Sequence, residues 1–557
     1  AAEQLARSYT YSLAARAPML QQLAALALAF AQVAPQARAP ATATRLAASP
    51  RLVAAAPPRA SASSSSGRQQ QPAAEAPGRP DGRPYEVVIA GGGIGGLCTA
   101  LVLQNLGCRV RVFEKTSRYR PFGGPIQIAS NAAESIRRID EATYEKILAR
   151  ATVIGDRTNG LKDGKSNEWF ATFDLDSPAR RRGQVSSVVI DRPVLQEILL
   201  QKVRNTVTKG AEVVGCREVG DRVLVELSSG ETHEADLLIG SDGIKSRVRD
   251  VFDPGRRAPV WSGYTCVAGM AYCRPDDIEE VGYKVWVGSR KYFVSVDVGG
   301  GRIQWYAFLN IPPGDATVPK GPGLVPWLRE GEFGDWAADV HQLLDASPLD
   351  EVEQRDLYDR PPDLQWSSGR VCLLGDAAHP MMPNLGQGGG MAIEDALVLG
   401  QELKKLQDSD YSAKTDSIPR ALRRYNNNRV LRAAAVQGLS RISSAFLFQY
   451  QPPLDLQWGF PPRLANVGPR SIITRACQGF LQKVAFPLQF EFLFSFPGEI
   501  NPEIFAEGTP GDFGTWQAAE TASAAGRPAE GPRQRGQPER ELISKEKSLG
   551  EWLSQYW

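Results

Sequence analysis

The stretch Tyr85-Glu-Val-Val-Ile-Ala-Gly-Gly-Gly-Ile-Gly-Gly-Leu97 decides the fold that we predict for this chain. The consecutive apolar residues Val87 to Ile89 indicate a strand buried on both faces, and this strand runs directly into Gly91-x-Gly93-x-x-Gly96. In such a strand, turn and helix, the first glycine permits the turn and the second lets a pyrophosphate approach the backbone. The third lets the helix pack closely on the strand. The pattern therefore predicts a site for an adenine dinucleotide.

Two further features strengthen this prediction. The free N–H groups and the positive dipole end of the new helix would favour an anion by about 0.3 to 1 kcal/mol. A second strand, Arg109 to Phe113, ends at Glu114. Because an acidic residue about 20 positions beyond the glycine turn reaches a ribose hydroxyl, Glu114 is the expected ribose ligand. The alternative is a simple strand-to-helix turn without a ligand.

Composition limits the class of protein. With 557 residues, the chain has room for two or three domains and a sizeable core. The net charge is only +2, and residues 1–83 hold nine Arg against three acidic residues, so the remainder is mildly acidic. This argues against nucleic acid as a partner. The seven Cys are odd in number and form no Cys-x-x-Cys pair, which favours a reducing compartment and no metal site. With three His in the chain, a histidine-ligated zinc site or a Ser-His-Asp hydrolase has little support.

Residues 1–83 have the composition of a targeting leader, being rich in Ala, Arg, Pro and Ser and free of Lys. The apolar run Leu23 to Ala34 is too short to span a bilayer but suits the central region of a signal peptide. The following stretch, Ala37 to Arg83, is typical of an organelle transit sequence. Together they predict a plastid protein that passes through the secretory route, and a low-complexity disordered leader is the alternative.

Apolar patterning predicts the elements that follow. The region Val260 to Leu309 holds aromatic strand-like runs separated by turns, which favours an antiparallel sheet. We also predict helices at Asn131 to Arg150, from Arg192 onward, at Met391 to Leu406 and over residues 420–450, a strand at Val185 to Ile190, and a hairpin of Arg222 to Leu227 with Glu231 to Ile239.

The C-terminal part contains a phenylalanine-rich segment, Phe480 to Pro497, with six Phe in 18 residues. Its length and the charges of Lys483 and Glu491 exclude a transmembrane helix. Either the segment dips into a membrane interface, or it packs on the body as core. The charged, Gly- and Pro-rich tail from Gly508 to Lys547 is predicted to be disordered.

Three separated motifs stand together: the glycine turn, Asp242-Gly243 after a buried strand, and Gly375-Asp376 followed by Pro383 and a second glycine turn at Gly386. Together they resemble the class A flavoprotein monooxygenases. The resemblance implies that the first motif binds the ADP half of FAD. The Asp-Gly motif would lie near the pyrophosphate and serve nicotinamide cofactor use, and the Gly-Asp motif would hold the ribityl chain. The implied cofactor-binding residues are Gly91, Gly93, Ile94, Gly95, Gly96, Glu114, Arg192, Gln196, Asp242, Gly243, Gly375, Asp376, Pro383, Gly386, Gln387 and Gly388.

Further stretches resemble the zeaxanthin epoxidase branch of that family, among them Gly124 to Asn131, Tyr292 to Gly300 and Asn384 to Asp395. The branch implies that a flavin C4a-hydroperoxide delivers oxygen from O₂ to the 5,6 double bond of a carotenoid β-ring. NADPH, through ferredoxin and its reductase, would be the electron source. The chain departs from the branch at Tyr119 to Gly123, which replaces a Gly-Glu-Gly lead-in, and at Ser241, Lys245 and Gly390.

The resemblance implies an α/β fold in which a Rossmann-like, glutathione-reductase-type FAD domain is interleaved with an antiparallel-sheet substrate domain and followed by C-terminal helices. The expected FAD domain covers residues 84–120, 185–250 and 360–400, and the substrate domain covers residues 121–184 and 255–359. Residues 401–500 would form a helical, membrane-proximal region, and residues 501–557 a disordered tail. Location in the plastid, at the thylakoid or envelope membrane, is implied.

A long hydrocarbon substrate implies an apolar tunnel with one polar end. Tyr264, Tyr292, Trp305 and Tyr306 are candidates to line it, although about half of the residues on a strand must point away. Because the cofactor carries the oxygen chemistry, no catalytic side chain is assigned and no metal is expected. Gln127 and His379 are candidates near the flavin, and a structural hydrogen bond is the alternative role for His379.

Two other functions remain open from the sequence. A hydroxylase of the same fold would act on a quinone or an aromatic ring. A non-redox flavoprotein could bind hydrophobic molecules, but it would leave the Asp-Gly and Gly-Asp motifs without a role.

Overall fold

The computed structural model describes residues 83–119, 124–203, 205–251, 258–407, 417–449 and 478–496. The predicted leader and the C-terminal tail lie outside these ranges. A six-stranded sheet in the order β18-β19-β12-β1-β2-β8 carries the glycine turn at the end of its strand β1. The neighbours β12 and β2 run parallel to β1, and the apolar residues of these strands are buried, as continuous Val, Ile and Leu runs predict. The strands are β1 (Glu86–Ala90), β2 (Arg109–Glu114), β8 (Val207–Lys209), β12 (Leu237–Gly240), β18 (Ser367–Ser368) and β19 (Val371–Leu373).

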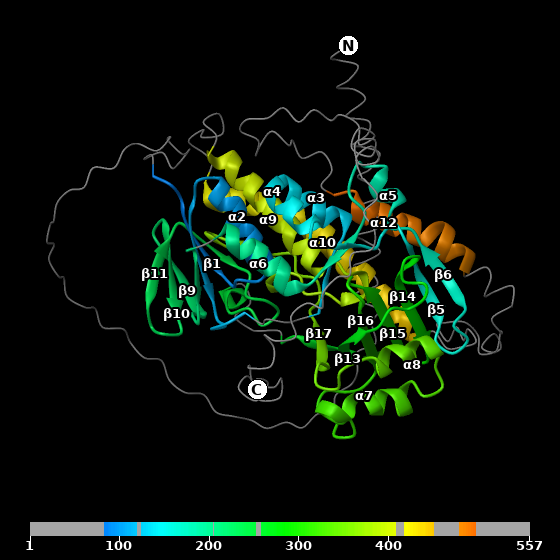
Figure 1. Ribbon diagram of the computed structural model, residues 1–557. Coiled ribbons are helices and arrows are strands. Elements are labelled where there is room, and N and C mark those ends of the chain that lie inside the picture. The colour runs from blue at the N-terminus through cyan, green and yellow to red at the C-terminus, as the bar shows by residue number, and fades with distance from the viewer. Residues whose placement is uncertain are drawn as a thin grey trace, which may run out of the picture.

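Helices form a layer over one face of this sheet, and a three-stranded sheet packs against β12 and β1 (Figure 1). The glycine-turn helix α2 packs against α9 and α6, and α9 packs in turn against α3 and α10. The helices are α2 (Ile94–Asn105), α3 (Ser130–Ile139), α4 (Glu141–Leu148), α5 (Ser177–Arg180), α6 (Arg192–Lys202), α9 (Gly388–Gln407) and α10 (Ile418–Gln449). The small sheet consists of β9 (Val213–Val219), β10 (Arg222–Leu227) and β11 (Thr232–Ala235).

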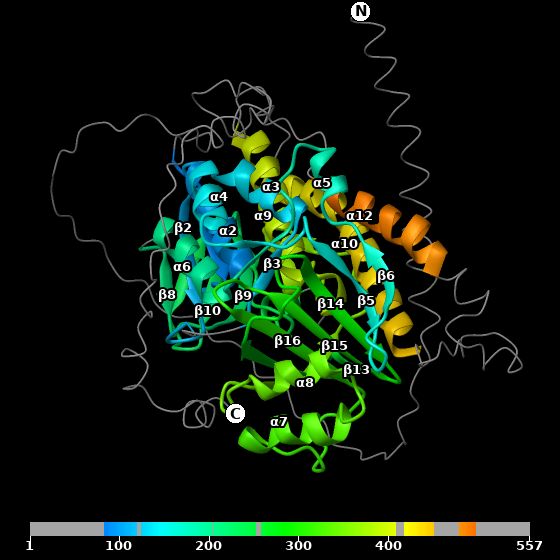
Figure 2. The same ribbon diagram turned by 45° about the vertical axis from the view of Figure 1, so that its right-hand side comes forward.

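A seven-stranded sheet in the order β17-β13-β16-β15-β14-β5-β6 forms the other half of the molecule (Figure 2). Helix α8 packs on its outer face over a core that includes Trp286, Trp305 and Phe333. The strands are β5 (Thr158–Asp163), β6 (Trp169–Phe173), β13 (Val260–Tyr272), β14 (Val281–Gly288), β15 (Lys291–Asp297), β16 (Arg302–Leu309) and β17 (Glu353–Asp359). The helices α7 (Leu324–Pro326) and α8 (Ala338–Asp345) belong to this half, whereas α12 (Phe486–Phe494) packs against α5 and α3.

Short turns and a third sheet complete the described part of the chain. Strands β3 (Ile126–Ile128), β7 (Val188–Ile190) and β4 (Thr152–Val153) form the third sheet. The turns are 3₁₀ at Val248–Val251, Gly321–Gly323, Gly375–Ala377 and Pro383–Leu385, and π-helical at Trp327–Glu332 and Leu481–Ala485.

The predicted fold class is confirmed, whereas three predicted elements were wrong in extent. The second hairpin strand divides at Asp236, because that carboxylate accepts the backbone N–H of Glu86 at 2.8 Å and the guanidinium of Arg222 at 3.0 Å. The chain then leaves β11 for β12 in the parallel sheet. The predicted helix from Asn131 breaks at Asp140, whose carboxylate caps α4 by accepting the N–H of Thr143. The strand predicted from Val185 begins at Val188 in β7.

A buried charge network joins α9 and α10. Arg429, which is fully buried, donates from Nε to Asp395 Oδ1 and from Nη1 to Glu394 Oε2, each at 2.7 Å. Asp395 Oδ2 in turn lies 2.6 Å from His379 Nε2 and accepts the N–H of Gly375 at 3.0 Å. Burial alone would raise the pKa of Asp395, but His379, Arg429 and these hydrogen bonds lower it to about 2. The network therefore fixes the loop after β19 to both helices.

Replacing Arg429 with Met should lower the free energy of unfolding by about 3 to 5 kcal/mol, because two buried carboxylates would lose the guanidinium that they share. Chemical denaturation measures the change. The matched control is Arg420→Met at an exposed position of the same helix, for which we expect a change within about 0.5 kcal/mol. Equal stability of the two variants would contradict the assigned role of the network.

Candidate cofactor and substrate site

A continuous cavity of about 3570 Å³ extends from the glycine turn to the seven-stranded sheet and the C-terminal helix. Its wall includes residues of the β1 turn, the end of β2, the start of α6, the loop after β19, and helices α10 and α12. Because sites for one small ligand typically measure about 300 to 1,000 Å³, the cavity has room for a dinucleotide together with a second large molecule.

The glycine turn matches an anion site. A Cβ atom at Gly91 would collide with the carbonyl of Ser241, and one at Gly96 with the carbonyl of Gly91, whereas no atom lies within 4 Å of the Cβ position at Gly93. Gly93 is the N-cap of α2, which has no capping side chain and no acidic residue in its first turn. Gly93, Ile94 and Gly95 line the cavity. The helix therefore offers uncapped N–H groups there, as the pyrophosphate of FAD requires.

Glu114 lies beside this turn, as predicted. Its Oε2 accepts the N–H of Gly92 at 2.7 Å, and its Oε1 accepts two hydrogen bonds from Thr116, each at 2.9 Å. A carboxylate has about four lone-pair sites, so capacity for a ligand hydroxyl remains. Gln196 holds the same turn from α6, donating to the carbonyl of Gly92 at 3.3 Å. Glu114 and Gln196 both line the cavity.

The Asp-Gly motif approaches the cavity through its backbone. Ser241 and Gly243 line the wall, but the Asp242 carboxylate accepts the N–H of Arg247 at 2.7 Å and thereby orders the 3₁₀ turn behind it. Burial raises the pKa of Asp242. The other carboxylate oxygen, Oδ1, is buried and has no hydrogen-bond partner among the described residues, so the role of Asp242 in cofactor binding stays a prediction. The turn also positions Arg249, which donates to the carbonyls of Ala377 at 2.6 Å and Ala378 at 3.0 Å.

The Gly-Asp motif reaches the same cavity. Asp376 lines it and is solvent-accessible there. Desolvation by the surrounding protein raises the pKa of Asp376, and electrostatic interactions with His379 and Arg192 oppose this shift. Arg192, Pro383, Gly386 and Gly388 also line the cavity. The three motifs thus converge, with Glu114 and Asp376 in one wall.

Two other predicted residues lie off the cavity wall. Gln387 is 2% exposed, and its Oε1 accepts a hydrogen bond from Asn131 at 3.0 Å, so its side chain anchors the start of α9. His379 is 1% exposed and pairs with Asp395, which gives it the structural role that was the alternative to a role near the flavin. Gln127 does line the cavity, where it faces Gly386.

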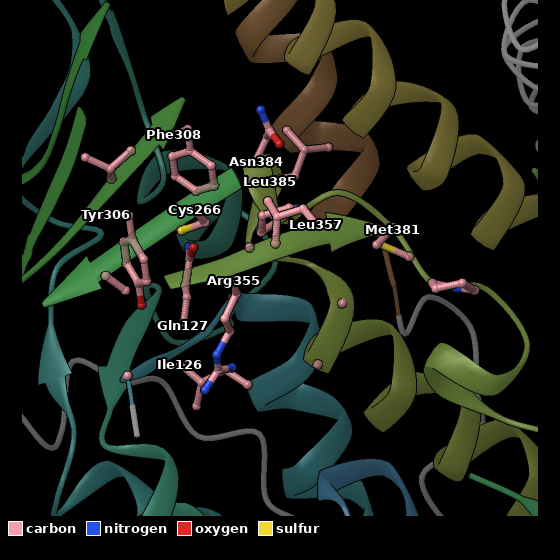
Figure 3. Close-up of a pocket in the computed structure, with 18 of the residues that line it drawn as sticks. Ile126, Gln127, Cys266, Tyr306, Phe308, Arg355, Leu357, Met381, Asn384 and Leu385 are labelled. Atoms are coloured by element: carbon pink, nitrogen blue, oxygen red, sulfur yellow. The ribbon is translucent and has the colours of Figure 1, made fainter. Parts of the chain in front are cut away.

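The aromatic sheet divides by strand alternation. Tyr292 and Tyr306 line the cavity, as predicted. Tyr264 is not among the lining residues, and its hydroxyl donates to the carbonyl of Ser444 at 2.7 Å. Trp305 points to the opposite face, where its Nε1 donates to Ser347 Oγ at 2.7 Å. Successive strand residues face opposite sides, so Tyr306 and Trp305 cannot share one. In Figure 3, Tyr306 and Phe308 face the cavity together with Cys266 and Gln127.

The lining residues that the sequence prediction missed come from the neighbouring strands and the C-terminal helix. Val285, Val294 and Leu357 follow the same period of two, and Phe486 and Phe490 follow a helical period. The period of two in the strands could be seen in the sequence. The sequence did not show which part of the protein the phenylalanine-rich segment packs against. In both views α12 lies beside α5 and β6 (Figures 1 and 2), and the rings of Phe486 and Phe490 contact Phe173 of β6.

The phenylalanine-rich segment has one buried and one exposed face. Phe490, Phe492 and Phe494 are buried in the main core, which matches the packing alternative. Phe480, Val484 and Leu488 are 59%, 41% and 59% exposed, yet they also line the cavity. They therefore form an apolar rim at its mouth. Across the described ranges, no helix has the length and hydropathy to cross a membrane, and no cluster of His, Cys, Asp and Glu could hold a metal ion.

Comparison with known proteins agrees with this geometry. A family model described as an FAD binding domain matches residues 84–259 and 360–437. The chain is 41% identical to chloroplastic zeaxanthin epoxidase of an Oncidium hybrid cultivar over 70% of its own length and 58% of the relative's. Residues 84–259 and 360–437 therefore belong to the FAD binding domain family. The spinach (Spinacia oleracea) zeaxanthin epoxidase is also 41% identical, over 70% of this chain and 57% of that protein.

A solved structure supports the family assignment. A variant of HpxO from Klebsiella pneumoniae, complexed with FAD, aligns with a TM-score of 0.58 at 26% identity, covering 65% of this chain and 90% of that one. The region between the two family-model matches contains strands β13 to β17 of the seven-stranded sheet. The chain spans less than three fifths of the length of the curated relatives.

Replacing Gly93 with Ala should leave the fold intact but weaken FAD binding about tenfold or more, the loss that corresponds to about 1.4 kcal/mol. The added methyl group would meet no protein atom, and the backbone φ of −72° suits alanine, but the methyl group would occupy the place of the pyrophosphate. Flavin titration of the apoprotein measures affinity, and thermal unfolding measures stability.

The matched control is Gly331→Ala, where a Cβ atom also meets nothing within 4 Å. We expect unchanged FAD affinity for this variant. Unaltered affinity in the Gly93 variant would show that the turn does not approach the cofactor.

Proposed function

We propose that this protein is an FAD-dependent monooxygenase that epoxidises the 5,6 double bond in the β-ring of a xanthophyll, converting zeaxanthin to antheraxanthin and then to violaxanthin. The observation that carries the proposal is the continuity of the cavity, which joins the glycine turn to an apolar region under the aromatic sheet. The resemblance to proteins named zeaxanthin epoxidase supports the choice of substrate. The proposed FAD domain is formed by residues 84–120, 185–250 and 360–400, and the substrate domain by residues 121–184 and 255–359.

The polar half of the cavity would hold the cofactor. The uncapped start of α2 binds the pyrophosphate, and Glu114 accepts a ribose hydroxyl. Asp376 binds the ribityl chain, while the backbone of Gly386 to Gly388 lies toward the ring system. Once bound and reduced, FAD supplies the activation of O₂. The protein's task is then to position the alkene and exclude water.

The apolar half of the cavity fits a long hydrocarbon. Each buried CH₂ contributes about 0.8 kcal/mol, so about a dozen outweigh one hydroxyl hydrogen bond of about 1 kcal/mol. Tyr292 and Tyr306 contribute aromatic surface, and burial raises the pKa of both phenols well above the usual value, which keeps them neutral at physiological pH. Asn384 orients Tyr292 by donating to its hydroxyl at 3.1 Å. These side chains therefore orient the substrate rather than transfer protons.

The electron source and the location follow from the family resemblance. We place the reaction in the plastid, at the thylakoid or envelope membrane, with NADPH as reductant through ferredoxin or its reductase. The names of the curated relatives, which are chloroplastic, support the plastid. The apolar rim of the cavity mouth supports peripheral membrane contact, because a bilayer is where a carotenoid dissolves.

Incubation of the full-length protein with zeaxanthin, NADPH and a ferredoxin system should yield products that have gained one and then two oxygen atoms. Chromatography with mass spectrometry identifies the epoxides. The variant Asp376→Ala should lose flavin colour and product together, whereas Asp345→Ala, an exposed residue of α8 distant from the cavity lining, should retain both. A phenolic product from an aromatic substrate, or full flavin content and activity in the Asp376 variant, would overturn the proposal.

Replacing Phe480, Val484 and Leu488 with Ser should reduce binding to phosphatidylcholine–phosphatidylglycerol vesicles about tenfold or more while FAD remains bound, because each apolar side chain loses most of about 1.5 to 3 kcal/mol of burial. Co-sedimentation measures the bound fraction. The control replaces Val214, Val219 and Leu364, which are 39%, 49% and 53% exposed elsewhere on the surface. Equal sedimentation of the two triple variants would exclude membrane contact through the rim.

A further inference from the structure

Tyr119 lies at the dinucleotide end of the cavity, within the segment where this chain departs from the zeaxanthin epoxidase pattern. It follows β2 by five positions and lines the cavity wall. A Cβ atom added to Gly92 would collide with the Tyr119 hydroxyl and would lie 3.4 Å from Glu114 Oε2. The phenol therefore reaches over the middle glycine of the turn, beside the carboxylate that we assign to the ribose.

The hydroxyl of Tyr119 is buried and has no hydrogen-bond partner among the residues that the structure describes. Polar atoms that are buried in native proteins nearly always have a partner, so a lone hydroxyl in a ligand cavity indicates a partner supplied by the ligand. Burial and the nearby negative charge of Glu114 both raise the pKa of Tyr119. The phenol is consequently protonated at physiological pH and available as a donor.

The ring of Tyr119 is held in place from its other side. The ammonium group of Lys209 lies 5.1 Å from the ring centroid, a distance at which a cation is attracted by an aromatic face. Lys209 is placed there by β8, where it pairs in register with Glu114 of β2. Two neighbouring strands thus supply the carboxylate and the support of the phenol.

We infer that Tyr119 is a further cofactor-binding residue, whose hydroxyl donates to a ribose hydroxyl of the adenosine half of FAD while Glu114 accepts from the sugar. The inference rests on the FAD site and not on the identity of the substrate. A carboxylate binds a sugar only as an acceptor, so a neutral donor beside it completes the recognition of a diol.

The variant Tyr119→Phe, prepared as full-length apoprotein, should bind ADP about five- to tenfold more weakly, which is the factor expected for one hydrogen bond. Calorimetry measures the affinity, and displacement by FAD confirms that ADP occupies the cofactor site. FMN, which lacks adenosine, should bind the variant and the wild type equally. The matched control is Tyr144→Phe on α4, which lies off the cavity lining and should change neither affinity.

An analogue of ADP that lacks both ribose hydroxyls isolates the contact. The wild type should prefer ADP to 2′,3′-dideoxy-ADP, and Tyr119→Phe should lose part of that preference. The inference is overturned by equal or tighter ADP binding in the variant, by an equal loss for both nucleotides, or by a loss of FMN binding. If the variant folds poorly, equal affinity of the wild type for the two nucleotides overturns it instead. Because no carotenoid is used, failure here leaves the epoxidase proposal standing, and failure of epoxidation leaves this contact standing.

Discussion

Water-excluded ion pairs between α9 and α10 are the constraint on which the cofactor site depends. Arg429 is fully buried with Glu394 and Asp395, and Arg432 adds two further hydrogen bonds to Glu394 at 2.8 Å. Buried charges of this kind tolerate only a narrow range of geometry, because any separation leaves a charge without solvent or partner. The start of α9 and the Gly375 N–H are attached to this network, so the loop carrying Asp376 has a defined place.

Hydrogen bonds also fix the other cofactor motifs relative to one another. Arg249 connects the turn after Asp242 to the carbonyls following Asp376, and Gln196 connects α6 to the glycine turn. Groups far apart in the sequence are therefore fixed to one another before any ligand arrives. A dinucleotide that extends across the end of a parallel sheet requires such convergence, since its two halves contact different segments.

Much of the fold and part of the site could be predicted from the sequence, for identifiable physical reasons. The glycine turn and Glu114 were predictable because steric limits on Cβ atoms and the reach of β2 leave few alternatives. The division of the hairpin at Asp236 was not, because it depends on Arg222 and the Glu86 backbone, which only the folded chain brings near. For the same reason the sequence could not identify Asp395 as the partner of His379, or Arg247 as a partner of Asp242. Strand alternation did foretell that either Trp305 or Tyr306, but not both, would face the cavity.

Helix α12 separates the cavity from the outer surface of the protein by a single layer of helix. Phe490 belongs to both the core and the cavity lining, and Leu488, two positions earlier, belongs to both the lining and the outer surface. Because a closely packed helix moves as a unit, a contact that displaces the outer side chains of α12 also displaces the side chains that line the cavity. The shape of the cavity at this end is thus set jointly by the protein and by the medium that touches it.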